Sequence, residues 1–325
     1  MKLPRRKFLH LATGAAALPA VSRVAWAQTY PSRPVRIIVG GLPAGPIDIT
    51  ARIIGQWLQD RLGQPFVVED RPGAGGNIAT ELVVRAAPDG YTLLMTQSSA
   101  AINTTLYEKL NFDFLRDIAP VASVIRIPLV LEANPSFSAK TVAELIAYAK
   151  ASPGEINLAS PAIGTAPQVA GELFKMMTGV NMNNVPYRST APMLTDLLGG
   201  HVQVAFDGVL SSIEQIRAGK LRALAVASAA RLEVLPDIPT VEDTVPGFEA
   251  SGWSGICAPK NTPAEIVDKL NIEINAALAD PKIKARFADA GAIPFAGSPG
   301  DFAKFITDET EKWAKVIKFA GLKPE

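Results

Sequence analysis

Residues 35–62 read VRIIVGGLPAGPIDITARIIGQWLQDRL, and the fold prediction starts from this stretch. The β-branched run Val35–Val39 predicts a short buried strand, and the Gly- and Pro-rich residues after it predict a loop. From Ile47 to Leu62 the apolar residues recur every three or four positions, which is the spacing of one helix face. The stretch is therefore a strand, a loop and a helix, the unit from which α/β sheets are built.

The same unit recurs along the chain. Phe66–Glu69 and Asn77–Ala86 form a second strand and helix, and Tyr91–Met95 with Ala100–Tyr107 forms a third. Later strands are expected at 129–131, 156–159, 202–206, 221–227 and 249–258, and later helices at 141–151, 165–178, 193–198, 210–218, 263–279, 281–290 and 299–320. Three such units in sequence predict parallel strands covered by helices, and hence the α/β class.

The chain is long enough for two lobes of ordinary domain size. Because no flexible linker divides it, we expect two α/β lobes that are joined by crossing strands and enclose a ligand cleft. Residues 28–127 and 251–325 are assigned to lobe 1, and residues 128–250 to lobe 2. The C-terminal helices then return to the first lobe.

Residues 1–27 have the layout of a signal peptide. They contain five basic residues and no acidic one, with an apolar run from Phe8 to Val21 and the small-x-small sequence Ala25-Trp26-Ala27. We expect cleavage after Ala27 and export to the periplasm. Arg5-Arg6 resembles a twin-arginine export signal, with an ordinary Sec signal as the alternative.

The remaining composition excludes several classes of function. Removing residues 1–27 leaves a formal charge of (32 − 5) − 31 = −4, without the clustered Lys and Arg that nucleic acids or anionic membranes require. No later apolar stretch reaches membrane-spanning length. One cysteine (Cys257) and one histidine (His201) remain, so the chain lacks the ligands of a Cys- or His-rich metal site. We expect no metal, no cofactor, no nucleic acid and no membrane insertion of the mature chain.

Three loops rich in Gly, Pro and Ala each follow an expected strand and open an expected helix. They are Pro43–Asp48, Gly73–Asn77 and Ser160–Thr165. Free backbone N–H groups at such helix starts can bind anions, although an ordinary turn has the same composition. Asp48 is interpreted as a helix cap. Asp207 follows the strand at 202–206, at the sheet edge where α/β proteins bind ligands, or caps its own turn.

The loops Pro43–Asp48 and Glu69–Asn77 resemble the first-lobe signature of the Bug family, the substrate-binding receptors of tripartite tricarboxylate transporters. The likeness continues in order along nearly the whole mature chain, through residues 87–94, 185–188, 196–202, 206–207, 219–226, 235–240 and 258–271. Ser189 departs from this pattern, because glycine usually follows the Val-Pro-Tyr-Lys/Arg segment. It could add a hydroxyl donor or narrow the pocket.

The resemblance implies a type 2 periplasmic-binding-protein fold whose lobes close on a small carboxylate, either a di- or tricarboxylate or an aromatic acid. It also implies delivery of that ligand to a membrane permease, and no catalytic residue. Carried over by position, the implied ligand-binding residues are Pro43, Gly45, Ile47, Asp48, Ala74 and Gly76 in lobe 1, Ser98 and Asn103 near the mouth, and Ser160, Gly164, Thr165, Ala166, Tyr187 and Asp207 in lobe 2.

Two other functions stay open. The receptor could feed a membrane sensor kinase instead of a permease, and an exported hydrolase or isomerase could use His201 or Asp207. If the chain is a receptor, the hinge for lobe closure is expected near Ile125–Pro128 and Ala250–Trp253, where the chain crosses between lobes.

Overall fold

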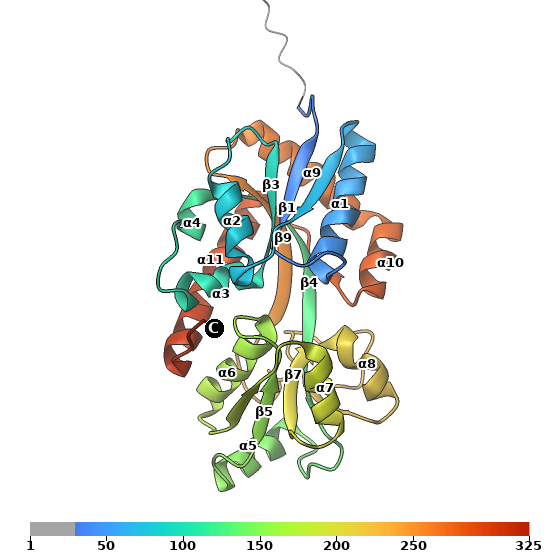
Figure 1. Ribbon diagram of the computed structural model, residues 1–325. Helices are drawn as coiled ribbons and strands as arrows, with labels where there is room; N and C mark the ends of the chain where they lie inside the picture. The colour runs from blue at the N-terminus through green and yellow to red at the C-terminus, as the bar shows by residue number, and fades with distance from the viewer. Residues whose placement is uncertain (1–29, 325) are drawn as a thin grey trace, which may run out of the picture.

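The computed structural model describes residues 30–324 as a mixed α/β protein with two lobes stacked along its long axis (Figure 1). The expected signal peptide, residues 1–27, lies outside the described residues. The first lobe opens with β1 (Val35–Val39), α1 (Pro46–Leu62), β2 (Phe66–Asp70), the 3-10 turn η2 (Ala74–Gly76), α2 (Asn77–Val84), β3 (Thr92–Gln97), α3 (Ser98–Leu106) and α4 (Phe114–Asp117).

Strand β4 (Ile118–Ala133) leads into the second lobe. There follow α5 (Val142–Ala151), β5 (Asn157–Ser160), α6 (Ala166–Thr178), β6 (Asn183–Pro186), α7 (Thr190–Leu198), β7 (Val204–Gly208), α8 (Val209–Arg217) and β8 (Arg222–Val226). Strand β9 (Ser251–Pro259) returns to the first lobe, and α9 (Ala264–Ala279), α10 (Pro281–Asp289), β10 (Ile293–Pro294) and α11 (Pro299–Ala320) complete the chain.

The strands follow the order β2-β1-β3-β9-β4-β7-β5-β6, and β8 and β10 also pair with β4. Strand β1 is parallel to both β2 and β3, which confirms the pairing predicted from the first three strand–helix units. The two crossing strands pair differently from these parallel strands. Strand β9 runs antiparallel to β3, and β4 runs antiparallel to β9. The sheet is therefore parallel within each lobe's outer strands and antiparallel where the lobes join.

Strand β4 belongs to both lobes. Its residues Ile118–Pro128 pair with β9, and its residues Leu129–Ala133 pair with β7 and β8. The sequence predicted a strand only at 129–131. The first half of β4 was missed because Pro120 and Pro128 lack the N–H that a ladder normally uses, and Pro120 lies at a register shift where the pairing is interrupted.

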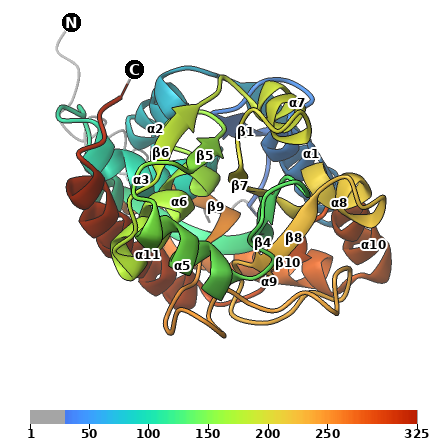
Figure 2. The same ribbon diagram turned by 90° about the horizontal axis from the view of Figure 1, so that it is seen from below.

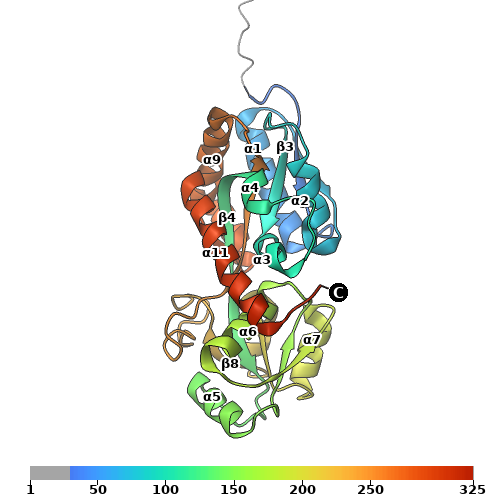
Figure 3. The same cartoon turned by 90° about the vertical axis from the view of Figure 1, so that its left-hand side faces the viewer.

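Helix α11 lies along the joint between the lobes, beside α3 of the first and α6 of the second (Figure 3). The indole N–H groups of Trp253 on β9 and Trp313 on α11 donate to the same carboxylate, that of Glu309, at 3.0 and 2.9 Å. All three side chains are buried. Because an unpaired buried N–H costs about 1–3 kcal/mol, this shared acceptor fixes α11 against the crossing strand.

At Gly255 on β9, the crossing strands and α11 approach so closely that no side chain fits. A Cβ added there would lie 2.2 Å from Phe302 Cζ and 2.7 Å from the Ala122 carbonyl oxygen. We expect Gly255→Ala to lower the free energy of unfolding by about 1–3 kcal/mol, as overpacked cores do, measured by urea denaturation. Gly300→Ala is the matched control, because Gly300 is exposed and an added Cβ there meets nothing closer than 3.7 Å. Equal stability of the two variants would contradict this packing.

Candidate functional site

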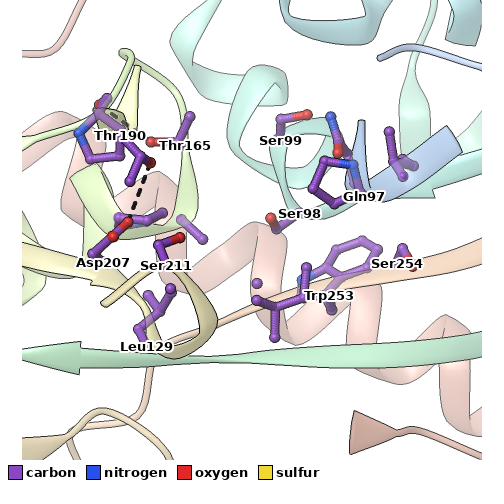
Figure 4. A pocket seen from close by; sticks show the side chains of 18 of the residues that line it. Gln97, Ser98, Ser99, Leu129, Thr165, Thr190, Asp207, Ser211, Trp253 and Ser254 are labelled. Atoms are coloured by element: carbon purple, nitrogen blue, oxygen red, sulfur yellow. Dashed lines mark hydrogen bonds between the residues drawn. The ribbon is translucent and has the colours of Figure 1, made fainter. Parts of the chain in front are cut away.

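A cavity of about 420 Å³ lies between the lobes, beside the crossing strands (Figure 4). One part of its wall is polar and comprises Thr50, Gln97, Ser98, Ser99, Thr165, Ser189, Thr190, Asp207, Ser211 and Ser254. The other part is apolar and comprises Pro46, Ile47, Ile125, Ile127, Leu129, Pro161, Ala162, Ala166, Pro167, Gly208, Gly252 and Trp253. No Lys or Arg is among these lining residues, so no cationic side chain faces a ligand from this wall.

Five helices begin at the wall of this cavity. They are α1 and α3 in the first lobe and α6, α7 and α8 in the second (Figures 1 and 2). Their N-cap residues are Gly45, Gln97, Thr165, Ser189 and Gly208, and none of these makes a side-chain capping bond.

Of the described helices that begin elsewhere, α4, α5, α10 and α11 are capped by side chains, whereas α2 and α9 are not. Asp113, Thr141, Asp280 and Ser298 accept bonds from the first turns of α4, α5, α10 and α11. Uncapped first-turn N–H groups and the positive ends of five helix dipoles therefore converge on one cavity. This arrangement can bind an anion without a cationic side chain.

The first two loops are held together by direct backbone contact. A Cβ added at Gly40 would lie 2.8 Å from Gly76 Cα, so no side chain fits between the loops. Asp48, interpreted from the sequence as a helix cap, instead accepts from the Ala44 N–H at 2.8 Å in the preceding loop. It also pairs with Arg52 at 2.8 Å. Asp48 is buried, so its role in the structure is to shape the loop.

Asn103 supports the second loop from α3. Its Nδ2 donates to the Gly75 carbonyl at 3.1 Å and to Asn77 Oδ1 at 3.0 Å. The Ser99 hydroxyl also donates to the Gly75 carbonyl, at 3.1 Å. Gly164 of the third loop lies against the same helix, where an added Cβ would come within 2.9 Å of Leu106. Helix α3 thus positions loops from both lobes.

At the second-lobe end of the cavity, Asp207 is surrounded by hydroxyl groups. Thr190 donates to Asp207 Oδ1 at 3.4 Å (Figure 4), and the Ser212 hydroxyl lies 3.2 Å from Oδ2. Burial raises the pKa of Asp207 to about 6, although the Gly208 N–H and the neighbouring hydroxyls stabilise the charged form. Behind it, burial and the Asp207 charge raise the pKa of Glu132 to about 8.

The structure brings some of the expected site residues together and leaves others outside the cavity wall. Ile47, Ser98, Thr165, Ala166 and Asp207 line it. The expected residues that do not line it are Pro43, Gly45, Asp48, Ala74, Gly76, Asn103, Ser160, Gly164 and Tyr187. Tyr187 directs its hydroxyl to Asp196 Oδ2 at 2.7 Å and packs with the cluster that contains Met193. Ligand contact by any of these residues remains a prediction.

Sequence reasoning missed much of the wall. Ile125, Ile127 and Leu129 on β4 and Trp253 on β9 face the cavity from the crossing strands. The segments 125–128 and 250–253 were singled out only as a hinge. Their position at the crossing was a usable signal, because residues there border both lobes. Ser189, noted as a departure from the family pattern, does line the cavity.

Residues 30–324 also bear on membrane insertion and on metal binding. No helix there is both long and apolar enough to span a bilayer. Within the same residues, no group of three or more His, Cys, Asp or Glu side chains could hold a metal ion. His201 is 74% exposed and lies outside the cavity wall.

Known proteins are similar to this chain in both sequence and fold. Residues 50–322 match the family model described as tripartite tricarboxylate transporter family receptor. Protein BugT of Bordetella pertussis is 41% identical over 300 residues, covering 91% of this chain and 92% of that protein.

Two similar solved structures hold ligands. R. palustris Rpa4515 with adipate is 36% identical with a TM-score of 0.77, and the alignment covers 91% of this chain and 100% of that one. MatC from Rhodopseudomonas palustris with bound malate is 31% identical with a TM-score of 0.73, covering 89% and 100%.

The raised pKa of Glu132 should make the free energy of unfolding depend on pH. Between about pH 4.5 and 8 the folded state keeps a proton on Glu132 that the unfolded chain releases, so this residue's contribution to the free energy of unfolding falls as pH rises. Glu132→Gln removes this pH-dependent contribution to the free energy of unfolding. We expect the variant to gain on the order of 2–4 kcal/mol relative to wild type between pH 5 and pH 8, measured by urea denaturation. Glu214→Gln, at an exposed position on α8, should show no such trend. A pH-independent difference for Glu132→Gln would show that its carboxyl titrates normally.

Proposed function

Because the chain belongs to the tripartite tricarboxylate transporter receptor family, we propose that it captures a small carboxylate in the cavity between its lobes and delivers it to the family's membrane permease. The observation that carries this proposal is the convergence of five uncapped helix N-termini on one cavity without Lys or Arg. Charge-assisted hydrogen bonds from backbone N–H groups to a carboxylate are among the stronger protein hydrogen bonds.

The apolar part of the wall narrows the class of ligand. Ile47, Ile125, Ile127, Leu129 and Trp253 give the cavity a surface that favours hydrocarbon over a densely hydrated ion. A carboxylate that carries an aliphatic or aromatic body satisfies both parts of the wall. Adipate and malate, held by the two related structures, are small carboxylates with an aliphatic body.

The proposal requires binding and release but no bond-making step. Asp207 is the one ionisable side chain in the wall, and its partners are hydroxyl groups and a backbone N–H rather than a nucleophile–base pair. We place the receptor in the periplasm, after export directed by residues 1–27. That location supplies both a solute and a permease facing the same compartment.

Lobe closure is the second part of the proposal. We take residues 28–127 with 251–325 as one moving unit and residues 128–250 as the other. Strand β4 supports this division, because it exchanges β9 for β7 and β8 between Pro128 and Leu129. A small rotation there changes the cavity without breaking either lobe's own sheet.

Filling the cavity should abolish ligand binding while keeping the fold. We expect Ala162→Phe to remove the thermal shift that a stabilising carboxylate gives to wild type, because its ring occupies the cavity. At about 100 times its Kd such a ligand adds about 2.7 kcal/mol, or a few degrees in Tm. The measurement is a thermal-shift screen of di-, tri- and aromatic carboxylates. Ala147→Phe, exposed on α5, is the matched control. A retained shift in Ala162→Phe would place the ligand elsewhere.

Closure should be visible as a distance change between the lobes. Spin labels on Gln56→Cys in α1 and Thr195→Cys in α7 occupy exposed positions on helices that begin at opposite walls of the cavity. Cys257 is buried, so the labels react at the introduced cysteines. We expect ligand to shorten this distance, measured by pulsed electron spin resonance. The pair Gln56→Cys and Lys284→Cys, both in the first unit, should not change. An unchanged first distance with bound ligand would refute closure.

A further inference from the structure

Behind the second-lobe wall lies a buried carboxyl group that ligand capture as described above does not use. Glu132, on β4, is fully buried, and its Oε2 has no hydrogen-bond partner in the protein. Strand β4 pairs with β7 so that Val130 is opposite Asp207 and Glu132 is opposite Ala205. Glu132 and Asp207 are therefore diagonal neighbours on one face of the sheet.

One hydroxyl group connects the two carboxyl groups. Ser212 Oγ lies 2.9 Å from Glu132 Oε1 and 3.2 Å from Asp207 Oδ2, and Ser212 is itself buried. A serine has a single hydroxyl hydrogen, so it donates to one carboxyl group and accepts from the other. If both were ionised, one of them would lack this bond and the two charges would repel each other in a low-dielectric site.

The surroundings decide which carboxyl group keeps the proton. Asp207 also receives bonds from Thr190, Ser211 and the Gly208 N–H, which stabilise its charge. Glu132 has Ser212 as its one partner. The proton therefore resides on Glu132, which donates to Ser212, and Ser212 donates to an ionised Asp207. The higher pKa of Glu132, about 8 against about 6, agrees with this order.

No cation among residues 30–324 neutralises this pair. Neither carboxyl group lies within ion-pair distance of a Lys or Arg. On β8, Arg222 is opposite Ala133 and directs its guanidinium to the carbonyl oxygens of Pro135, Phe137 and Ala139. On α8, Glu214 and Arg217 pair with each other at the surface, and on α7 Asp196 is bound by Tyr187 and His201. Arg188, before α7, is exposed.

We propose, on the basis of the proposed function, that Asp207 selects ligands whose far end carries a hydrogen-bond donor, an ammonium foremost, and that a ligand with a carboxylate there binds only with uptake of a proton. The near carboxylate is held at the helix N-termini. An ammonium against Asp207 supplies the missing countercharge, whereas a second carboxylate meets a negatively charged acceptor. Glu132 is a positioning residue, because it keeps Asp207 charged through Ser212.

Isothermal titration of matched probes tests this assignment. Adipate and 5-aminopentanoate differ only at one end, as do the shorter succinate and 3-aminopropanoate. At pH 7 we expect the ammonium probe of at least one pair to bind about tenfold or more tightly than its dicarboxylate. Titration in buffers of different ionisation enthalpy should show uptake of about one proton per dicarboxylate and none for the ammonium probe. Dicarboxylate affinity should then fall about tenfold per pH unit above pH 6.

Variants give an independent readout. Asp207→Asn offers a neutral amide that can donate, so we expect it to reverse the preference within a pair and to abolish the proton uptake. Ser212→Ala should change the pH profile while keeping the ammonium preference, as a positioning role requires. Glu214→Gln is the control acid on α8 and should match wild type. Arg188→Gln tests whether a cation at the rim binds the far carboxylate instead.

Each outcome bears on one of the two proposals. Equal binding of both members of a pair, with no proton uptake and no change on Asp207→Asn, would overturn the role of Asp207 and leave carboxylate capture intact. Loss of dicarboxylate binding in Arg188→Gln with no effect of Asp207→Asn would also overturn it. If no probe and no other carboxylate binds, carboxylate capture itself fails, and this inference with it.

Discussion

The hydrogen bonding of β4 on both of its edges is the constraint on which the rest of the molecule depends. One strand of 16 residues pairs with β9 in the first lobe and with β7 and β8 in the second. Its continuous backbone fixes where Ile125, Ile127 and Leu129 meet the cavity, and it carries Glu132 behind the wall. The loops that open the helices are arranged around this strand, so the cavity forms where the strand changes partners.

The alternation of strands and helices was readable from the sequence because it is a local signal. The apolar spacing and the Gly- or Pro-rich loops identified β1 with α1. The sequence also indicated anion sites at the starts of α1 and α6, and neither helix has a side-chain cap. The sequence did not predict the short strands that lack a clear apolar pattern. Strand β6, for example, has the sequence Asn183-Asn184-Val185-Pro186 and is mostly exposed. Strand β10 has only two residues, and its pairing with β4 is what defines it.

The site was less predictable because its parts come from distant segments. The three glycine-rich loops were found, yet several of their residues, such as Gly76 and Gly164, prove to be positions where backbone packs against another element. The carboxyl pair could not be found at all. Glu132 and Asp207 are separated by 75 positions, and their proximity follows from the register of β4 with β7, which no spacing in the sequence encodes. Ser212 gains its role only through that register.

Helix α11 gives the cleft a closed side. Because it contacts α3 in one lobe and α6 in the other, sliding the lobes apart along β4 would break its contacts, whereas a twist about an axis near α11 would keep them. Under the proposed function, solute therefore enters and leaves by the opposite flank, the side on which Figure 2 shows α1 of the first lobe and α7 of the second. A membrane partner that senses the loaded state would read the rims of that flank, since the side covered by α11 changes least.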